Sequence, residues 1–436
     1  MSRKEADFET KTIRFGYDSK EHNYAVNVPI YQTAAFDLGD VDRAMALWAM
    51  EEDGGIYTRI GNPTVSELEK KLSAMTGAAS VVGVSSGMAA ISYTIMLLGE
   101  GGGNFVVGSS LYGGTQEAFT NFYSKHGIVG RFVENRDDPH SYEALIDEET
   151  KGIYIETISN PNAEIYDVDA IADIAHAHGI PLIVDNTVAT PYLYDPFTHG
   201  ADIAIYSGTK GLSGHGNVIA GFITEKGGFV YDEKKFPRIY EKSHKIRGVD
   251  GVARSPYDID PVAPLNIALR AFYLEFVGAN LSPVDAFLVI QGLDTLALRI
   301  RRQVETTEKL VAYLENHPHV LWVRHPSAKK SPYRELAQRD FPKGTGNVVS
   351  FGFDGTIEQV NIFFQNLNYF SYHVNIGDVR SLITNPTETT HAELNSSQKA
   401  LADIPEQLLR ISVGLESPED LIDDLEHGFS AAFSSK

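Results

Sequence analysis

The chain has 436 residues, of which 43% are hydrophobic and 22% charged, a composition typical of an enzyme with a large core. Its 37 basic and 58 acidic residues give a formal net charge of −21, so we expect no binding to nucleic acid or to anionic membranes. The chain has no cysteine, which excludes disulfides, thiolate metal sites and a cysteine nucleophile. At ~150 residues per domain, the length predicts two or three domains.

The N-terminal part of the chain shows little regular hydrophobic periodicity. Its first residues, MSRKEADFETK, lack the apolar core of a signal peptide, and no apolar run is long enough to span a bilayer, so we expect a cytoplasmic protein. The run DVDRAMALWAMEE predicts one short helix. We expect residues 1–58 to form an arm that lies on another surface, followed by a large domain over 59–285 and a C-terminal domain over 286–436.

The next run, ASVVGVSSGMAAISYTIMLL, predicts a strand, a turn and a helix. The backbone amides of Gly87 and Met88 then lie at a helix N-terminus, which is a suitable place for a phosphate group. The same turn also satisfies G-x-S-x-G from Gly83 to Gly87, the pattern of a hydrolase nucleophile elbow. A serine hydrolase that uses Ser85 is therefore the alternative from a different class of enzyme.

Two further strand-like runs end in polar residues. NFVVGSSLYGGT leads to Tyr112, and GIYIETISNPN leads to Asn160. The helix predicted over DVDAIADIAHAHG carries His176 and His178, which point in different directions at this spacing and make a poor pair of metal ligands. We therefore expect no metal.

The stretch from Ile180 to Gly216 predicts two short buried strands, each followed directly by reactive side chains. The first strand ends at Asp185 and the second leads to Lys210, so both side chains are expected at one edge of an α/β sheet. A lysine whose pKa is lowered by burial can hold an aldehyde cofactor as a Schiff base. A carboxylate beside a pyridine nitrogen keeps that nitrogen protonated, so the stretch suits a pyridoxal phosphate site.

Three neighbouring residues support this interpretation. Ser207 and Thr209 are expected on the same side of an extended segment, where both hydroxyls can face the cofactor phosphate. Gly208, which lies between them, leaves room for close approach.

After Gly221 the chain enters a long charged segment without clean periodicity, which is either an ordered insertion over the site or a mobile surface loop. A long amphipathic helix then leads into the C-terminal domain. Near the end of the chain, LLRISVGLE alternates apolar and polar residues like a strand, which places Arg410 on the polar face.

The runs VDNTVATPY, HGADIAIYSGTK and SGHG resemble the Cys/Met-metabolism family of pyridoxal-phosphate enzymes, and the resemblance covers nearly the whole chain. It implies an α/β fold of fold type I, similar to aspartate aminotransferase, with a mostly parallel sheet in the large domain and a smaller α+β C-terminal domain. It also implies a homotetramer built from dimers that share active sites.

The resemblance assigns a role to each remaining candidate residue. Tyr112 is expected over the cofactor ring and Asn160 near its ring hydroxyl, while Arg410 and Asn375 bind the substrate carboxylate. In the motif YTRIGNP, Tyr57 and Arg59 are expected to complete the phosphate site of a neighbouring subunit, as an N-terminal arm does in this family.

The reaction implied is replacement of the γ-substituent of an activated homoserine by sulfide, as in the O-acetylhomoserine sulfhydrylase branch of the family. Asn375, the long segment after Gly221, and Gly114 at the place of a lyase cysteine all favour this branch. Methionine γ-lyase and cystathionine γ-synthase or lyase activity stay open as alternatives.

Overall fold

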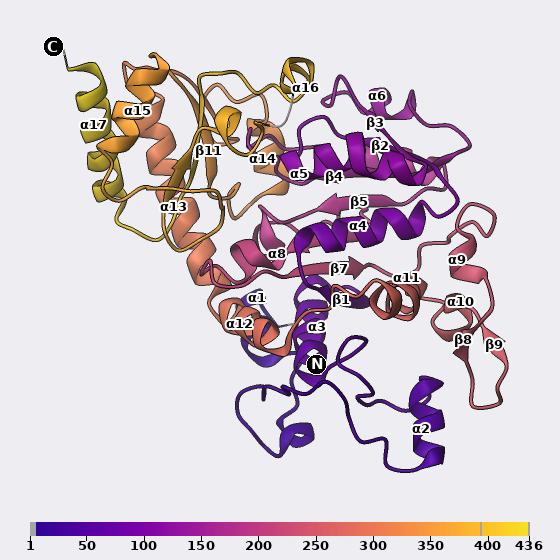
Figure 1. Ribbon diagram of the computed structural model, residues 1–436. Coiled ribbons are helices and arrows are strands. Elements are labelled where there is room, and N and C mark those ends of the chain that lie inside the picture. The colour runs from indigo at the N-terminus through magenta and orange to yellow at the C-terminus, as the bar shows by residue number, and fades with distance from the viewer. Residues whose placement is uncertain (1–5, 393–394, 435–436) are drawn as a thin grey trace, which may run out of the picture.

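A seven-stranded sheet forms the centre of the computed structural model, which describes residues 6–392 and 395–434 (Figure 1). The strand order is β1-β7-β6-β5-β4-β2-β3, and β7 is antiparallel to both of its neighbours while the other pairings are parallel. The expected mostly parallel sheet is therefore confirmed. Its strands are β1 (Ser80–Val84), β2 (Gly103–Val107), β3 (Ile128–Phe132), β4 (Thr150–Glu156), β5 (Leu182–Asp185), β6 (Ile203–Ser207) and β7 (Gly221–Glu225).

Helices cover both faces of this sheet, which explains why its central strands are continuous apolar runs. Leu182 and Val184 of β5 pack into one core cluster, with side chains from helices α3, α7 and α12, while Ile183 packs into the opposite cluster with α4. The helices in the first part of the chain are α1 (Phe8–Arg14), α2 (Val41–Trp48), α3 (Pro63–Thr76), α4 (Gly87–Leu98), α5 (Gly113–Glu117), α6 (His140–Glu143), α7 (Val168–Ala177), α8 (Thr190–Leu193), α9 (Pro237–Tyr240), α10 (Pro256–Ile259), α11 (Pro264–Ala268) and α12 (Pro283–Asp294).

A second, five-stranded sheet lies towards the C-terminus, in the order β10-β11-β14-β13-β12. Its strands are β10 (Val320–Arg324), β11 (Val348–Phe353), β12 (Ser371–Tyr372), β13 (Leu382–Thr384) and β14 (Leu408–Ser412). The helices here are α13 (Leu296–Leu314), α14 (Arg334–Asp340), α15 (Ile357–Gln365), α16 (Ser396–Leu401) and α17 (Pro418–Phe433). This is the smaller α+β unit that the sequence predicts.

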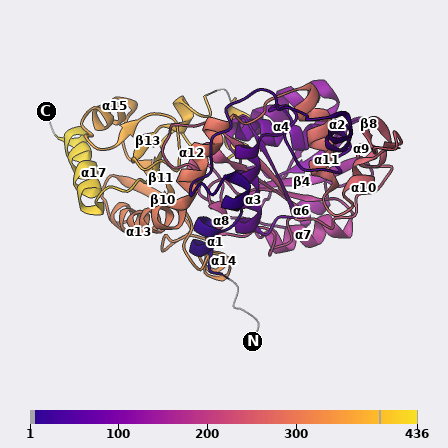
Figure 2. The same cartoon turned by 90° about the horizontal axis from the view of Figure 1, so that it is seen from below.

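The long helix α13 joins the two sheets. Its first half places Ile300 and Val304 in the core of the large sheet, and its second half places Leu310 and Leu314 in the core of the small sheet. Figure 2 shows α15 and α17 at one end of the molecule and β8 (Ser243–Arg247), α9 and α10 at the opposite end. The exact domain limits at 58 and 285 stay predictions, and the first five residues of the arm lie outside the described part.

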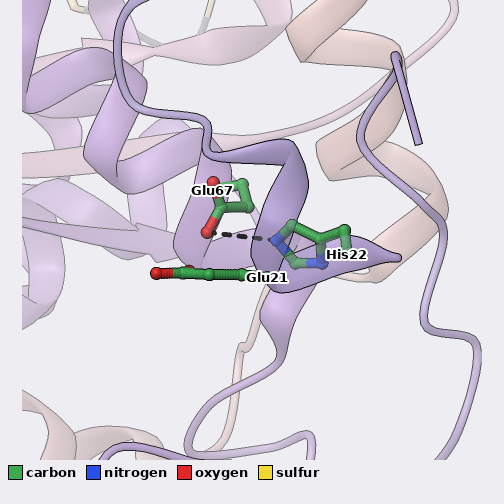
Figure 3. A group of neighbouring side chains, drawn as sticks. All are labelled: Glu21, His22 and Glu67. Atoms are coloured by element: carbon green, nitrogen blue, oxygen red, sulfur yellow. Dashed lines mark ion pairs between the residues drawn. The ribbon is translucent and has the colours of Figure 1, made fainter. Parts of the chain in front are cut away.

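The N-terminal arm is attached to α3 through a small polar cluster (Figure 3). The Nε2 atom of buried His22 lies 3.6 Å from Glu67 Oε1, and its Nδ1 atom lies 3.0 Å from the hydroxyl of Tyr31. The Nζ atom of Lys70 lies 2.8 Å from Glu67 Oε1 and 3.6 Å from Glu21 Oε2. Lys70 therefore supplies one positive charge that is shared by the two carboxylates.

His176 in α7 and His178, which follows the end of this helix, point to different partners, as the sequence predicts. The Nε2 atom of His176 lies 2.9 Å from Asp202, and that of His178 lies 3.4 Å from Glu143. The absence of a metal stays a prediction.

The charged segment after Gly221 is ordered. It contains the short helices α9 and α10 and the antiparallel pair β8 (Ser243–Arg247) and β9 (Ala253–Arg254). Within the described ranges, no helix combines the length and the apolar character needed to cross a membrane.

Candidate active site

A cavity of about 270 Å³ opens where the parallel strands end, between the large sheet and the C-terminal unit. Strands β4, β5 and β6 run parallel, so the residues at their carboxyl ends meet at one edge. The predicted site residues that line the cavity are Lys210, Asp185, Ser207, Thr209, Gly87, Met88, Tyr112, Asn160, Asn375 and Arg410.

Lys210 lies in a π-helical turn, Gly208–Leu212, that follows β6 directly. Its Nζ atom donates a hydrogen bond to Asn375 Oδ1 at 2.8 Å. Removal from bulk water lowers the pKa of Lys210 to about 8, and the positive charge of Arg410 acts in the same direction. The amine is therefore still mostly protonated near pH 7, but its neutral fraction is far larger than that of a lysine with the ordinary pKa of 10.5.

Arg299, which the sequence analysis missed, holds this turn in place from α13. Its guanidinium is buried and donates to the carbonyl oxygens of Gly211 at 2.9 Å and Leu212 at 3.1 Å. Gly214 has φ +71°, and a Cβ atom there would lie 1.9 Å from Arg299 Nη1, so only glycine leaves room for the guanidinium. The buried arginine thus fixes the backbone next to Lys210.

Asp185 ends β5 and faces the cavity, shielded from bulk solvent. Its carboxylate accepts from the backbone N–H of Thr187 at 3.0 Å and from the hydroxyl of Tyr154 at 3.3 Å. Desolvation raises the pKa of Asp185, and no basic side chain in the described ranges forms an ion pair with it. A cationic ring nitrogen from a ligand fits beside it.

Glu156 also lines the cavity, and the sequence analysis missed it. It is the last residue of β4, lies opposite Asp185 in the β4–β5 register, and is only 4% exposed. Its Oε1 accepts from the backbone N–H of Tyr112 at 2.6 Å, and its Oε2 from that of Asn160 at 3.2 Å. Burial and the neighbouring Asp185 raise the pKa of Glu156. Its position at the end of a predicted strand was the signal that was available.

Arg410 enters the cavity from β14 and is 1% exposed. Its Nη1 donates to Asn160 Oδ1 at 2.9 Å and its Nη2 to the carbonyl oxygen of Asn375 at 3.0 Å, while Nε has no protein partner among the described atoms. Burial lowers the pKa of Arg410 to about 10. A buried guanidinium that lines a cavity and has an unpartnered N–H is suited to an anion.

The N-terminus of α4, where the sequence predicts a phosphate group, forms one side of the cavity. The hydroxyl of Ser86 caps this helix by accepting from Ala89 N–H at 3.0 Å. A Cβ atom on Gly87 would lie 2.8 Å from Ser207 Cβ, so glycine is needed where the helix meets β6. The predicted extended segment through Ser207 and Thr209 is wrong, because the π-helical turn begins at Gly208, but both residues still line the cavity.

Two predicted site residues lie elsewhere. Tyr57 is 44% exposed, and the Arg59 guanidinium lies 3.7 Å from Glu275 of the same chain. Neither lines the cavity of its own chain, and the same holds for the described residues of the segment after Gly221.

The hydrolase alternative finds no support in this geometry. Ser86 faces the cavity instead of Ser85, and the described cavity lining contains no histidine to act as a base.

The donor set fits pyridoxal phosphate. Lys210 offers an amine whose pKa is lowered, and Asp185 offers a carboxylate that has no cationic partner among the described residues. The start of α4 offers backbone N–H groups, and Gly87 lets β6 approach this helix end closely.

Comparisons with known proteins agree with this donor set. A family model described as Cys/Met metabolism PLP-dependent enzyme matches residues 9–430. The chain is 36% identical to homocysteine synthase of Schizosaccharomyces pombe, with 98% of each chain covered, and 36% identical to O-acetyl-L-homoserine sulfhydrylase of Corynebacterium glutamicum, with 97% of each covered. A putative O-acetylhomoserine (thiol)-lyase of Campylobacter jejuni, solved with N'-pyridoxyl-lysine-5'-monophosphate, superposes with a TM-score of 0.92 at 32% identity, covering 98% of this chain and 100% of that one.

The lowered pKa of Lys210 predicts unusual reactivity in the cofactor-free protein. Acylation requires the neutral amine, so labelling of Lys210 should rise as the pH increases through about 8. The measurement is peptide mass spectrometry after brief exposure to acetic anhydride across a pH series, with exposed Lys330 as the internal comparison. Arg410→Ala should move the Lys210 midpoint to higher pH, and a midpoint near 10.5, the ordinary lysine value, would contradict the prediction.

Proposed function

The chain belongs to the Cys/Met metabolism family of PLP-dependent enzymes, and from this we propose that it converts O-acetyl-L-homoserine and sulfide into L-homocysteine and acetate. In this reaction the Cγ–O bond to acetate breaks and a Cγ–S bond forms. The observation that carries the proposal is the pairing of a low-pKa Lys210 with an anion-binding Arg410 in one cavity.

The charges of the cavity favour a neutral acyl group. Among the described residues that line it, the basic side chains are Lys210 and Arg410. If Lys210 serves the cofactor and Arg410 binds the α-carboxylate, no cation is left for an anionic leaving group such as succinate. The apolar residues that line the remaining wall are Ile91, Ile158, Val188, Ile219, Val374 and Ile376.

When bound, PLP supplies an aldehyde that exchanges amines and a ring that delocalises negative charge from the substrate carbons. Lys210 is the residue that would hold the aldehyde, with Asp185 at the ring nitrogen and Ser207, Thr209 and the start of α4 at the phosphate. The neutral amine of Lys210 could then accept the proton from the substrate Cα and later return it, and could remove a proton from Cβ as acetate leaves Cγ and return it there after sulfide has added to Cγ. The hydrogen bond from Lys210 to Asn375 keeps the amine on the same side of the cavity as Arg410.

Methionine γ-lyases and cystathionine γ-synthases or lyases of this family use the same reactive side chains. The preference for one reaction over another therefore depends on the residues around these side chains. A Cβ atom on Gly114 would lie 2.6 Å from the Tyr112 ring. A cysteine side chain at this place, as in methionine γ-lyases, would therefore require Tyr112 to move. Gly114 leaves the Tyr112 ring where it lies, which distinguishes this cavity from that of the lyases.

The function is tested by comparing substrates directly. O-acetylhomoserine with sulfide should give the highest kcat/KM in a panel that includes O-succinylhomoserine, O-acetylserine, methionine and cystathionine, each with and without sulfide. Homocysteine and α-ketobutyrate are quantified as products. Efficient α-ketobutyrate release from methionine without thiol, with little homocysteine from the acetyl ester, would indicate a lyase instead.

Arg410→Ala should raise KM for O-acetylhomoserine strongly, because it removes the charge expected to bind the substrate carboxylate. The loss of one partner of a desolvated charge pair costs roughly 2–5 kcal/mol. The visible spectrum of the bound cofactor should be preserved, which separates lost substrate binding from lost cofactor. An unchanged KM would mean that the carboxylate binds elsewhere.

We also propose that the enzyme is a homotetramer of dimers in which Tyr57 and Arg59 reach the phosphate site of the partner. Their position outside the cavity of their own chain supports this role. The apolar residues exposed on the same chain include Tyr24, Val26, Phe276 and Val277, which need cover. The proposed location is the cytoplasm.

A mixing experiment tests the shared site. Arg59→Ala and Lys210→Ala subunits should each form nearly inactive enzymes. After subunit exchange, a hybrid site that combines Lys210 of one subunit with Arg59 of the other should regain activity. If exchange is demonstrated by native mass spectrometry and no activity returns, Arg59 acts within its own chain.

A further inference from the structure

Glu156 connects two loops that enter the cavity from different elements. Each of its carboxyl oxygens accepts one backbone N–H, from Tyr112 after β2 and from Asn160 after β4. Hydrogen bonds to a carboxylate are stronger than those between neutral groups, and low polarity strengthens them further. One side chain of 4% exposure therefore fixes both loops.

Tyr112 and Asn160, whose backbone N–H groups bind Glu156, both carry side chains that the proposed reaction needs. The Tyr112 ring lines the cavity, and Tyr112 begins α5 without any side-chain cap of its own. The Asn160 side chain accepts a hydrogen bond from Arg410 at 2.9 Å, so its position sets the direction of the guanidinium. A shift of the Glu156 side chain would therefore move Tyr112 and the Asn160–Arg410 pair at the same time.

The charge of the Glu156 side chain matters as well as its shape. Glu156 lies opposite Asp185 in the sheet register, and both carboxyl groups face one cavity. Burial and Asp185 raise the pKa of Glu156, while the two N–H donors oppose that shift. A glutamine would offer one acceptor oxygen only and would turn its NH₂ group towards the second backbone N–H.

We propose that Glu156 is a positioning residue that holds the Tyr112 ring and the Asn160–Arg410 pair in register across the cavity. The inference rests on the proposed function, because it concerns the same cofactor and substrate. In this role, Glu156 does not contact the reacting atoms.

The test compares Glu156→Gln with a matched control, Asp424→Asn. Asp424 is also a buried carboxylate, 3% exposed, and accepts the backbone N–H groups of Asn368 at 2.7 Å and Tyr369 at 2.8 Å, but it lies in α17, away from the cavity. Both variants replace a backbone-bound carboxylate by an amide. They therefore separate a positioning effect in the site from a general loss of stability.

Glu156→Gln should lower kcat and raise KM for O-acetylhomoserine, with a loss of roughly 10- to 100-fold in kcat/KM, as expected when reacting groups are misplaced by about 1 Å. The visible circular dichroism of the bound cofactor should also change, because the Tyr112 ring moves. Asp424→Asn should lower the melting temperature but keep the wild-type kinetic constants and dichroism.

If Glu156→Gln behaves like Asp424→Asn, with wild-type kinetics and dichroism, the positioning role is refuted. If Glu156→Gln does not fold, Glu156→Asp takes its place, since it keeps the charge but is one methylene shorter, and wild-type constants and dichroism in that variant would refute the role equally. A colourless wild-type protein that does not turn over O-acetylhomoserine would instead refute the proposed function. A yellow, active wild type with an unaffected Glu156→Gln refutes the positioning role alone.

Discussion

Two positive charges, on Lys210 and Arg410, lie in one cavity without a carboxylate partner among the described residues, and the site is arranged around them. Such charges are costly to desolvate, and a ligand anion would offset part of that cost. Desolvation and the charge of Arg410 lower the pKa of Lys210 to about 8, which raises the neutral fraction of its amine. Arg410 keeps its charge and leaves Nε without a protein partner, which suits a substrate carboxylate.

The carboxyl groups of the cavity are kept apart from these cations by backbone hydrogen bonds. Asp185 is held by the N–H of Thr187, and Glu156 by two further backbone N–H groups. Within the described ranges, neither acid forms an ion pair with the lysine or the arginine. Asp185 remains free for a ring nitrogen, as the chemistry of PLP requires.

The two sheets bring the two cations together. Lys210 follows β6 of the large sheet, and Arg410 belongs to β14 of the small sheet, so their separation depends on how α13 joins the two units. Arg299 of α13 binds the carbonyl groups next to Lys210, which links the helix directly to the reactive turn. The positions of Lys210 and Arg410, to which we assign proton transfer and substrate binding in the proposed function, therefore depend on how this helix is placed.

The strands that carry the site could be predicted from the sequence, because short apolar runs that end in polar residues identify buried parallel strands locally. Lys210 and Asp185 could be predicted because they lie at or just after those strand ends. Asn160, Tyr112 and Arg410 could be predicted from the resemblance to the family motifs.

Other features required the tertiary structure, since they join residues far apart in the chain. Glu156 meets Tyr112 across 44 positions, and Arg299 meets Gly211 across 88. After Ser207 the chain forms a helical turn that is kinked at Lys210 (φ −91°, ψ −131°), where the sequence predicts an extended segment, and Arg299 of α13 donates to the carbonyl oxygens of Gly211 and Leu212 in this turn. Local sequence determined which side chains reach the sheet edge, and only packing decided which backbone groups hold them there.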